Sequence, residues 1–124
     1  MTIGEEILAL AAALTRAEEE ERDALARLAA AQEAALRRAL RDGVTAEECE
    51  DAFVCAGAFL AAAALESARA GGEELSSLRA GEVSVTKRAA GESGRRIRAL
   101  EAQAWALMRP YTKDGGFCFC TTQG

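Results

Sequence analysis

The first stretch of the chain alternates apolar and polar positions with the period of a helix. No residue that breaks a helix occurs between positions 3 and 41. Apolar side chains recur there at spacings of three and four, which places them on one face of an amphipathic helix. The residues that set this period are Ile3, Ile7, Leu10 and Leu14, followed by Leu25, Leu28, Leu36 and Leu40.

The same stretch contains one internal start signal and one stop signal. Thr15 and Glu18 have the spacing of a capping box, so the sequence favours a short helix followed by a longer one. Asp42 and Gly43 then provide a C-terminal stop. We therefore expect two helices before residue 42.

A second helix start follows this stop directly. Thr45 and Glu48 form another capping-box pattern, which predicts a helix over residues 46–70. Residues 52–65 carry no charge, so nearly the whole circumference of this helix must be covered by other parts of the protein. It is the predicted central core helix, because this uncharged run is too short to span a bilayer.

The period changes beyond residue 80. Alternation of Val83 and Val85 with polar side chains predicts a short, half-buried strand over residues 83–86. Residues 89–94 are predicted to form a loop, and the helical period returns from 95 to 109, where Pro110 ends it. Phe117 and Phe119 alternate with cysteines, which predicts a second strand over residues 117–120.

These elements predict a mainly α protein, a small helical bundle with a short strand or β-hairpin near the C-terminus. Residues 1–80 form the helical body. Residues 81–124 add a strand, a flexible loop, the last helix and a C-terminal strand arm. With 124 residues, we expect both parts to belong to one domain.

Charge is distributed unevenly along the chain. Residues 1–78 carry a net charge of −9 and residues 79–124 a net charge of +4. If the fold keeps these parts on opposite flanks, one copy can attract the next head to tail. Solvated helix faces are the simpler interpretation of the same pattern.

The residue types argue against metal binding and catalysis. The chain has four cysteines and no histidine. Cys49 and Cys55 are six residues apart on one predicted helix, so they point in different directions, and the Cys118 and Cys120 pair alone supplies only two ligands. No nucleophile elbow or phosphate-binding lysine motif is present. We expect no enzyme activity, no cofactor and no metal, with the cysteines packing as small apolar residues.

A basic segment offers a different function. Lys87, Arg88, Arg95, Arg96 and Arg98 lie within twelve residues, which suits either a nucleic acid or an acidic protein surface. No aromatic residue is interleaved with them for base stacking, and the whole chain is acidic. A small helical regulator that binds nucleic acid through residues 87–98 is the alternative function.

The order of elements in residues 45–120 resembles that of the small head–tail connector, or head-completion, proteins of tailed phages and prophages of Gram-positive bacteria. The resemblance rests on Gly81-Glu-Val-Ser-Val85, the helix after Arg95, Arg109-Pro-Tyr111 and Asp114-Gly-Gly-Phe-Cys-Phe119. It implies a virion-assembly protein that forms a homo-oligomeric ring beneath the portal and contacts other head-completion or tail proteins, close to DNA. It implies no catalysis.

The resemblance also suggests which residues make contacts. It implies strand positions at Val83 and Val85, a helix exit at Tyr111, and docking side chains at Phe117 and Phe119. The basic residues Lys87, Arg88, Arg95 and Arg96 complete the predicted partner-binding set. A terminal strand of this kind can add to a neighbour's sheet edge, or pair within its own chain with residues 83–86.

The start of the sequence bears on the predicted location. Acidic residues follow Met1 at the position where a secretory signal has basic residues. We therefore expect the bacterial cytoplasm during assembly and then the head–tail junction of the virion, with no membrane contact.

Overall fold

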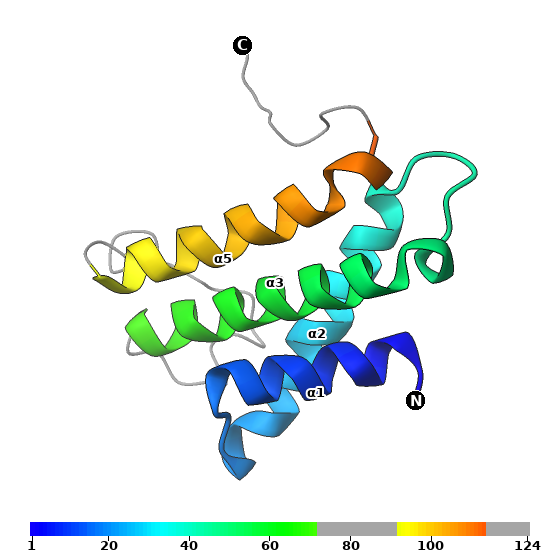
Figure 1. The fold of residues 1–124 in the computed structure, drawn as a ribbon. Coiled ribbons are helices and arrows are strands. Elements are labelled where there is room, and N and C mark those ends of the chain that lie inside the picture. Colours follow the sequence, from blue (N-terminus) through cyan, green and yellow to red (C-terminus); the bar gives the residue numbers. More distant parts are fainter. Residues whose placement is uncertain (72–91, 114–124) are drawn as a thin grey trace.

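A computed structural model describes residues 1–71 and 92–113. Over these residues the protein is a bundle of helices without strands, which confirms the mainly α prediction. The core helix α3 lies between α1 and α5, and α2 crosses behind them (Figure 1). The elements are α1 (Ile3–Thr15), α2 (Glu19–Ala39), the 3₁₀ helix η1 (Ala46–Cys49), α3 (Glu50–Gly71), α5 (Glu92–Met108) and the 3₁₀ helix η2 (Arg109–Tyr111).

The two helices predicted before residue 42 are present, but their boundary differs from the prediction. Thr15 does not cap the second helix; it ends α1, and its buried hydroxyl donates to the Ala11 carbonyl at 2.8 Å. The turn is made by Arg16, whose φ of 53° is left-handed. The N-cap of α2 is Glu18, whose backbone N–H donates a hydrogen bond to Glu21 Oε1 at 3.0 Å. The prediction that Thr15 caps the second helix is therefore wrong, although a second helix does start close to it.

The second capping box is confirmed. The Glu48 N–H donates to Thr45 Oγ1 at 3.2 Å, and the Thr45 N–H donates to Glu48 Oε1 at 2.9 Å. Gly43, with a φ of 87°, makes the turn before it. The helix predicted over residues 46–70 thus starts as η1 and continues as α3.

The core is built around α3 with many alanines and few large side chains. Gly57 allows α1 to approach closely: a Cβ at this position would lie 2.7 Å from Ile7 Cδ1. Small residues along α3 thus bring the other helices close to its axis, as the thin core of an alanine-rich sequence requires. The largest fully buried side chains are Phe53, Ile7, Leu25, Leu36, Leu65 and Met108.

The last helix starts earlier than predicted. Residues 92–94, assigned to a loop from sequence, belong to α5, and Gly94 is buried. Packing against α3 favours helix here despite the weak helix propensity of glycine and serine. The predicted end is confirmed, because α5 stops at Met108 and Pro110 lies in η2. The predicted strands 83–86 and 117–120, and residues 89–91 of the predicted loop, lie outside the described residues.

Backbone hydrogen bonds join the residues at the end of η2 to the end of α2. Leu40 and Thr112 form an isolated antiparallel bridge. The Arg41 N–H donates to the Tyr111 carbonyl at 3.0 Å, and the Lys113 N–H donates to the Ala39 carbonyl at 2.9 Å. This bridge fixes residues 111–113 beside the end of α2.

Candidate functional site

The described part of the predicted partner-binding set does not form a single site. Arg95 and Arg96 lie in the first turns of α5, whereas Tyr111 lies in η2 beyond its other end. Fifteen residues separate Arg96 from Tyr111, about 20 Å along a helix. The other predicted residues, Val83, Val85, Lys87, Arg88, Phe117 and Phe119, lie outside the described residues.

The basic start of α5 is exposed to solvent but not separated from the acidic part of the chain. Arg95, Arg96 and Arg98 are exposed. Arg96 Nε lies 3.4 Å from Glu66 Oε2 on α3, so one of the three charges is partly neutralised within the molecule. The described start of α5 therefore contacts an acidic side chain from the first part of the sequence.

Ion pairs continue from Glu66 across the bundle. Arg69 Nη1 lies 3.6 Å from Glu66 Oε2, and Arg69 Nη2 lies 2.7 Å from Glu21 Oε1 on α2. The hydrogen bonds from Arg69 hold the pKa of the Glu21 carboxyl below its ordinary value. This network joins α2, α3 and α5 and is structural in character.

An apolar hollow lies between α3 and α5, further along both helices. It has a volume of about 380 Å³, and Phe59, Gln103, Ala106 and Leu107 line it. Leu107 is 38% exposed, a high value for a leucine at the edge of a core stripe. Only Gln103 among these residues offers a hydrogen-bonding side chain, so the hollow suits an apolar partner group.

A second, acidic hollow lies where η1 and α3 meet η2. Tyr111 and Ala52 line it together with the buried Cys49. Burial, reinforced by the negative charge of Glu48, raises the pKa of the Cys49 thiol, so this cysteine is not an activated thiolate. Its Sγ donates to the Thr45 carbonyl at 3.5 Å, as a packed cysteine would. The carboxylates around this hollow are Glu47, Glu48, Glu50 and Asp51.

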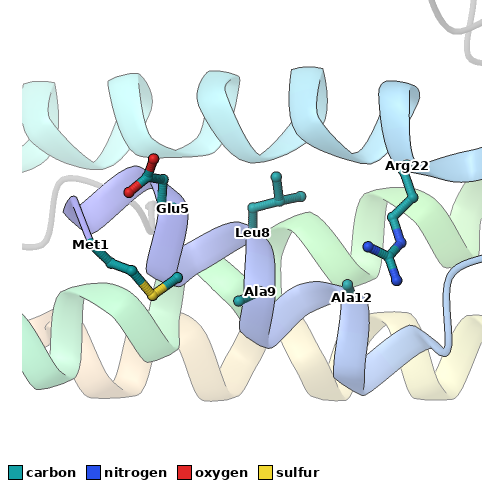
Figure 2. A pocket seen from close by; sticks show the side chains of 6 residues that line it. All are labelled: Met1, Glu5, Leu8, Ala9, Ala12 and Arg22. Carbon is teal, nitrogen blue, oxygen red and sulfur yellow. The ribbon is translucent and has the colours of Figure 1, made fainter.

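A third hollow, of about 450 Å³, lies between α1 and the start of α2. In Figure 2 the Leu8 side chain points towards α2 at its centre, with Glu5 and Arg22 near its opposite ends. Ala9 and Ala12 continue its apolar wall, and Met1, which also lines it, is 81% exposed. The hollow is therefore an apolar surface with one negative and one positive side chain at its borders.

These two apolar hollows were not predicted from the sequence. On the last helix, Met108 is fully buried, whereas the neighbouring Leu107 is partly exposed at the hollow. A sequence signal for the first helix did exist. Leu8, which lines the hollow, is a large apolar residue outside the helical face set by Ile3, Ile7, Leu10 and Leu14.

Two further structural features bear on the sequence predictions. Within residues 1–71 and 92–113, no three cysteine, aspartate or glutamate side chains gather as metal ligands would.

One helical stretch among these residues, Ala46–Ala70, is long and apolar enough to cross a membrane by length and composition. Of its most apolar window, 61% is buried inside the bundle, as expected for a core helix.

Comparisons of the chain with protein-family models, with curated proteins and with solved structures found no match.

Proposed function

We propose that this chain is a structural assembly protein that contacts copies of itself and other proteins through its helical surfaces. The observation that carries this proposal is the pair of apolar hollows on different flanks of the bundle. One lies on α1 and α2, the other on α3 and α5, and α3 lies between α1 and α5 (Figure 1). A subunit of a closed ring needs two different contact surfaces, because each copy meets its two neighbours with opposite sides.

The specific role we propose is that of a phage head–tail connector that forms a ring beneath the portal. This role rests on the resemblance of residues 45–120 to head-completion proteins, together with the two separate surfaces described above. In the ring, Phe117 and Phe119 provide aromatic contacts to a neighbouring copy. Large aromatic side chains of this kind dominate the energetics of protein interfaces.

Affinity capture from the native assembly setting tests the connector role. A tagged copy is expressed with its neighbouring genes, cross-linked and purified, and its partners are identified by mass spectrometry. We expect recovery of a portal or another head-completion protein. A matched sample carrying Ala9→Glu, which places a charge in the α1–α2 hollow, should recover less of it. Equal recovery of all structural proteins with and without the tagged chain would contradict the role.

A nucleic-acid-binding regulator is the second candidate, favoured by the exposure of Arg95, Arg96 and Arg98 within about one turn of α5. It predicts DNA binding that weakens steeply with salt. Replacing all three arginines with glutamine should abolish that binding, whereas Arg27→Gln on the exposed side of α2 should not. Absence of any DNA binding at low salt eliminates this candidate.

A further inference from the structure

The charged side chains of the described residues are divided between two sides of the bundle. Residues 1–23, which form α1 and the start of α2, carry seven acidic and two basic side chains. Residues 92–113, which form α5 and η2, carry two acidic and five basic side chains. Figure 1 shows α1 and α5 on opposite sides of α3. Opposite charges on opposite sides favour a head-to-tail contact between two copies, because two like sides would repel each other.

The acidic side has an apolar middle, which is the hollow between α1 and α2. The residues of its apolar wall are Leu8, Ala9 and Ala12. Figure 2 shows Glu5 near one end of this hollow and Arg22 near the other. Glu19 and Asp23 are exposed within one turn of Arg22, so the charge at this end is negative as well. We call the hollow with Glu5, Glu19 and Asp23 the acidic flank.

One exposed face of α5, continued by η2, has the complementary pattern. Arginines lie at both ends of this face and alanines in its middle, at spacings of three and four residues that place them on one side of a helix. We call this surface the basic face, and its residues are Arg95, Arg98, Ala102, Ala106 and Arg109. It spans about 20 Å, which is also the length of the 13-residue α1.

The basic face is available for a contact with a separate molecule. Among the described residues its three arginines have no ion-pair partner, in contrast to Arg96, which pairs with Glu66. Ala106 also lines the hollow between α3 and α5, so the basic face and that hollow form one continuous surface. The small side chains of Ala102 and Ala106 allow another helix to approach closely, because the distance between packed helices depends on the side chains at the contact.

We propose that the basic face of one copy binds the acidic flank of a second copy. Ala102 and Ala106 lie against the α1–α2 hollow, and the arginines at both ends of the basic face lie beside the acidic side chains at both ends of the hollow. Each copy thereby uses two different surfaces, as a heterologous contact requires. The inference rests on the proposed assembly function and adds which surface pairs with which, and the charges that select this pairing.

Charge reversal in the full-length chain tests the pairing, with association measured by analytical ultracentrifugation at low salt. The basic-face variant carries Arg95→Glu, Arg98→Glu and Arg109→Glu. The acidic-flank variant carries Glu19→Lys and Asp23→Lys. Each variant alone should associate about tenfold more weakly than the unchanged chain, because like charges then meet at the contact.

A mixture of these two variants provides the most specific comparison. In the mixture, each reversed surface can meet the reversed surface of the other variant, and each unchanged surface can meet an unchanged one. Opposite charges then face each other at every contact, so association should return to nearly that of the unchanged chain. The matched control carries Glu47→Lys and Asp51→Lys, which are exposed positions outside both surfaces, and should associate like the unchanged chain.

The possible outcomes separate this pairing from the proposed function. If the unchanged chain assembles, then full association of either variant alone, or no association of the mixture, would overturn the pairing and leave the assembly function standing. An unchanged chain that stays monomeric at low salt would contradict both. DNA binding that is lost in the basic-face variant without any loss of association would assign these arginines to a nucleic acid and overturn the pairing.

Helical circular dichroism of each variant should equal that of the unchanged chain. If glutamate on the basic face lowers the helical signal, glutamine at the same three positions replaces it. The glutamine variant removes the positive charges without adding negative ones, so it should weaken association several-fold. Unweakened association of this variant would overturn the pairing in the same way.

Discussion

At the scale of single residues, glycine and alanine on α3 decide how closely the helices approach. The hypothetical Cβ of Gly57 would meet three atoms of Ile7, the nearest at 2.7 Å, and Ile7 is fully buried. There is no room for the Ile7 side chain to move outwards without disturbing its neighbours. The close packing of α1 on α3 therefore depends on this one missing methyl group.

Gly57→Ala should lower the free energy of unfolding by about 1 kcal/mol, because overpacking outweighs the gain in helix propensity. Adding Ile7→Val removes the Cδ1 atom nearest to the new methyl group. The double variant should therefore be more stable than the sum of the two single effects predicts. Urea denaturation of the four proteins measures this coupling, and strict additivity would contradict the close contact.

The pair of Glu21 and Arg69 gives a residue-scale prediction about pH. The pKa of Glu21 is lowered in the folded protein, chiefly by the hydrogen bonds from Arg69, so the folded state binds fewer protons than the unfolded state between the two pKa values. The stabilisation is complete above the ordinary pKa of 4.5 and is lost as pH falls through the lowered one.

Glu21→Gln should consequently lower the free energy of unfolding at neutral pH by about 0.5 kcal/mol, the size typical of a pair that is partly open to solvent. The difference should shrink in acid, as the pH falls through the lowered pKa and the folded state takes up the proton as well. Chemical denaturation at the two pH values checks this, with Glu20→Gln as the exposed control. A difference that persists unchanged in acid would mean that Glu21 acts by packing instead of charge.

At the scale of elements, the capping pattern before α3 carries a separate prediction. Thr45 and Glu48 exchange two hydrogen bonds at the start of η1. Thr45→Ala should cost about 1 kcal/mol of stability, because one backbone N–H loses its partner. Thr45→Ser keeps the hydroxyl and should restore most of this loss. Thermal or urea unfolding compares the variants. Equal stability of the alanine and serine forms would mean that the hydroxyl at position 45 does not stabilise the helix start.

Much of the helical arrangement could be predicted because periodicity and caps are local signals. The helices before residue 42, the start near Thr45 and the stop before Pro110 all depend on residues close in sequence. The errors occurred where distant packing overrides such signals. Thr15 turns its hydroxyl back into α1, and Gly94 becomes helical through its burial beside other elements. Neither outcome is encoded in the neighbouring residues alone.

The candidate surfaces were harder to predict for the same physical reason. Each hollow is formed by residues of two helices. Leu107 lines one only because Phe59 of α3 lies opposite, and Leu8 lines the other together with Arg22 of α2. The sequence identified the charge of Arg96 but not its partner Glu66, since that pairing depends on α5 packing antiparallel to α3 (Figure 1). Composition indicates which residues can make contacts, and topology decides which ones do.

At the scale of the whole molecule, the bundle has two apolar flanks that a single copy does not cover with its described residues. A flank of this kind normally meets another surface. If the α1–α2 hollow of one copy contacts the α3–α5 side of the next, each copy uses two different surfaces. Such a contact repeats until the ring closes, which distinguishes it from a two-fold dimer.

The mass distribution in solution, measured by analytical ultracentrifugation, tests this central claim most directly. The unchanged chain should form oligomers larger than dimers, whereas Ala9→Glu and Leu107→Glu, each blocking one flank, should be monomeric. Their mixture retains one intact pair of surfaces and should therefore form a mixed dimer and nothing larger. Ala31→Glu, on an exposed position of α2 outside both hollows, should assemble like the unchanged chain. A chain that stays monomeric at all concentrations, or variants that assemble normally, would contradict assembly through these two flanks.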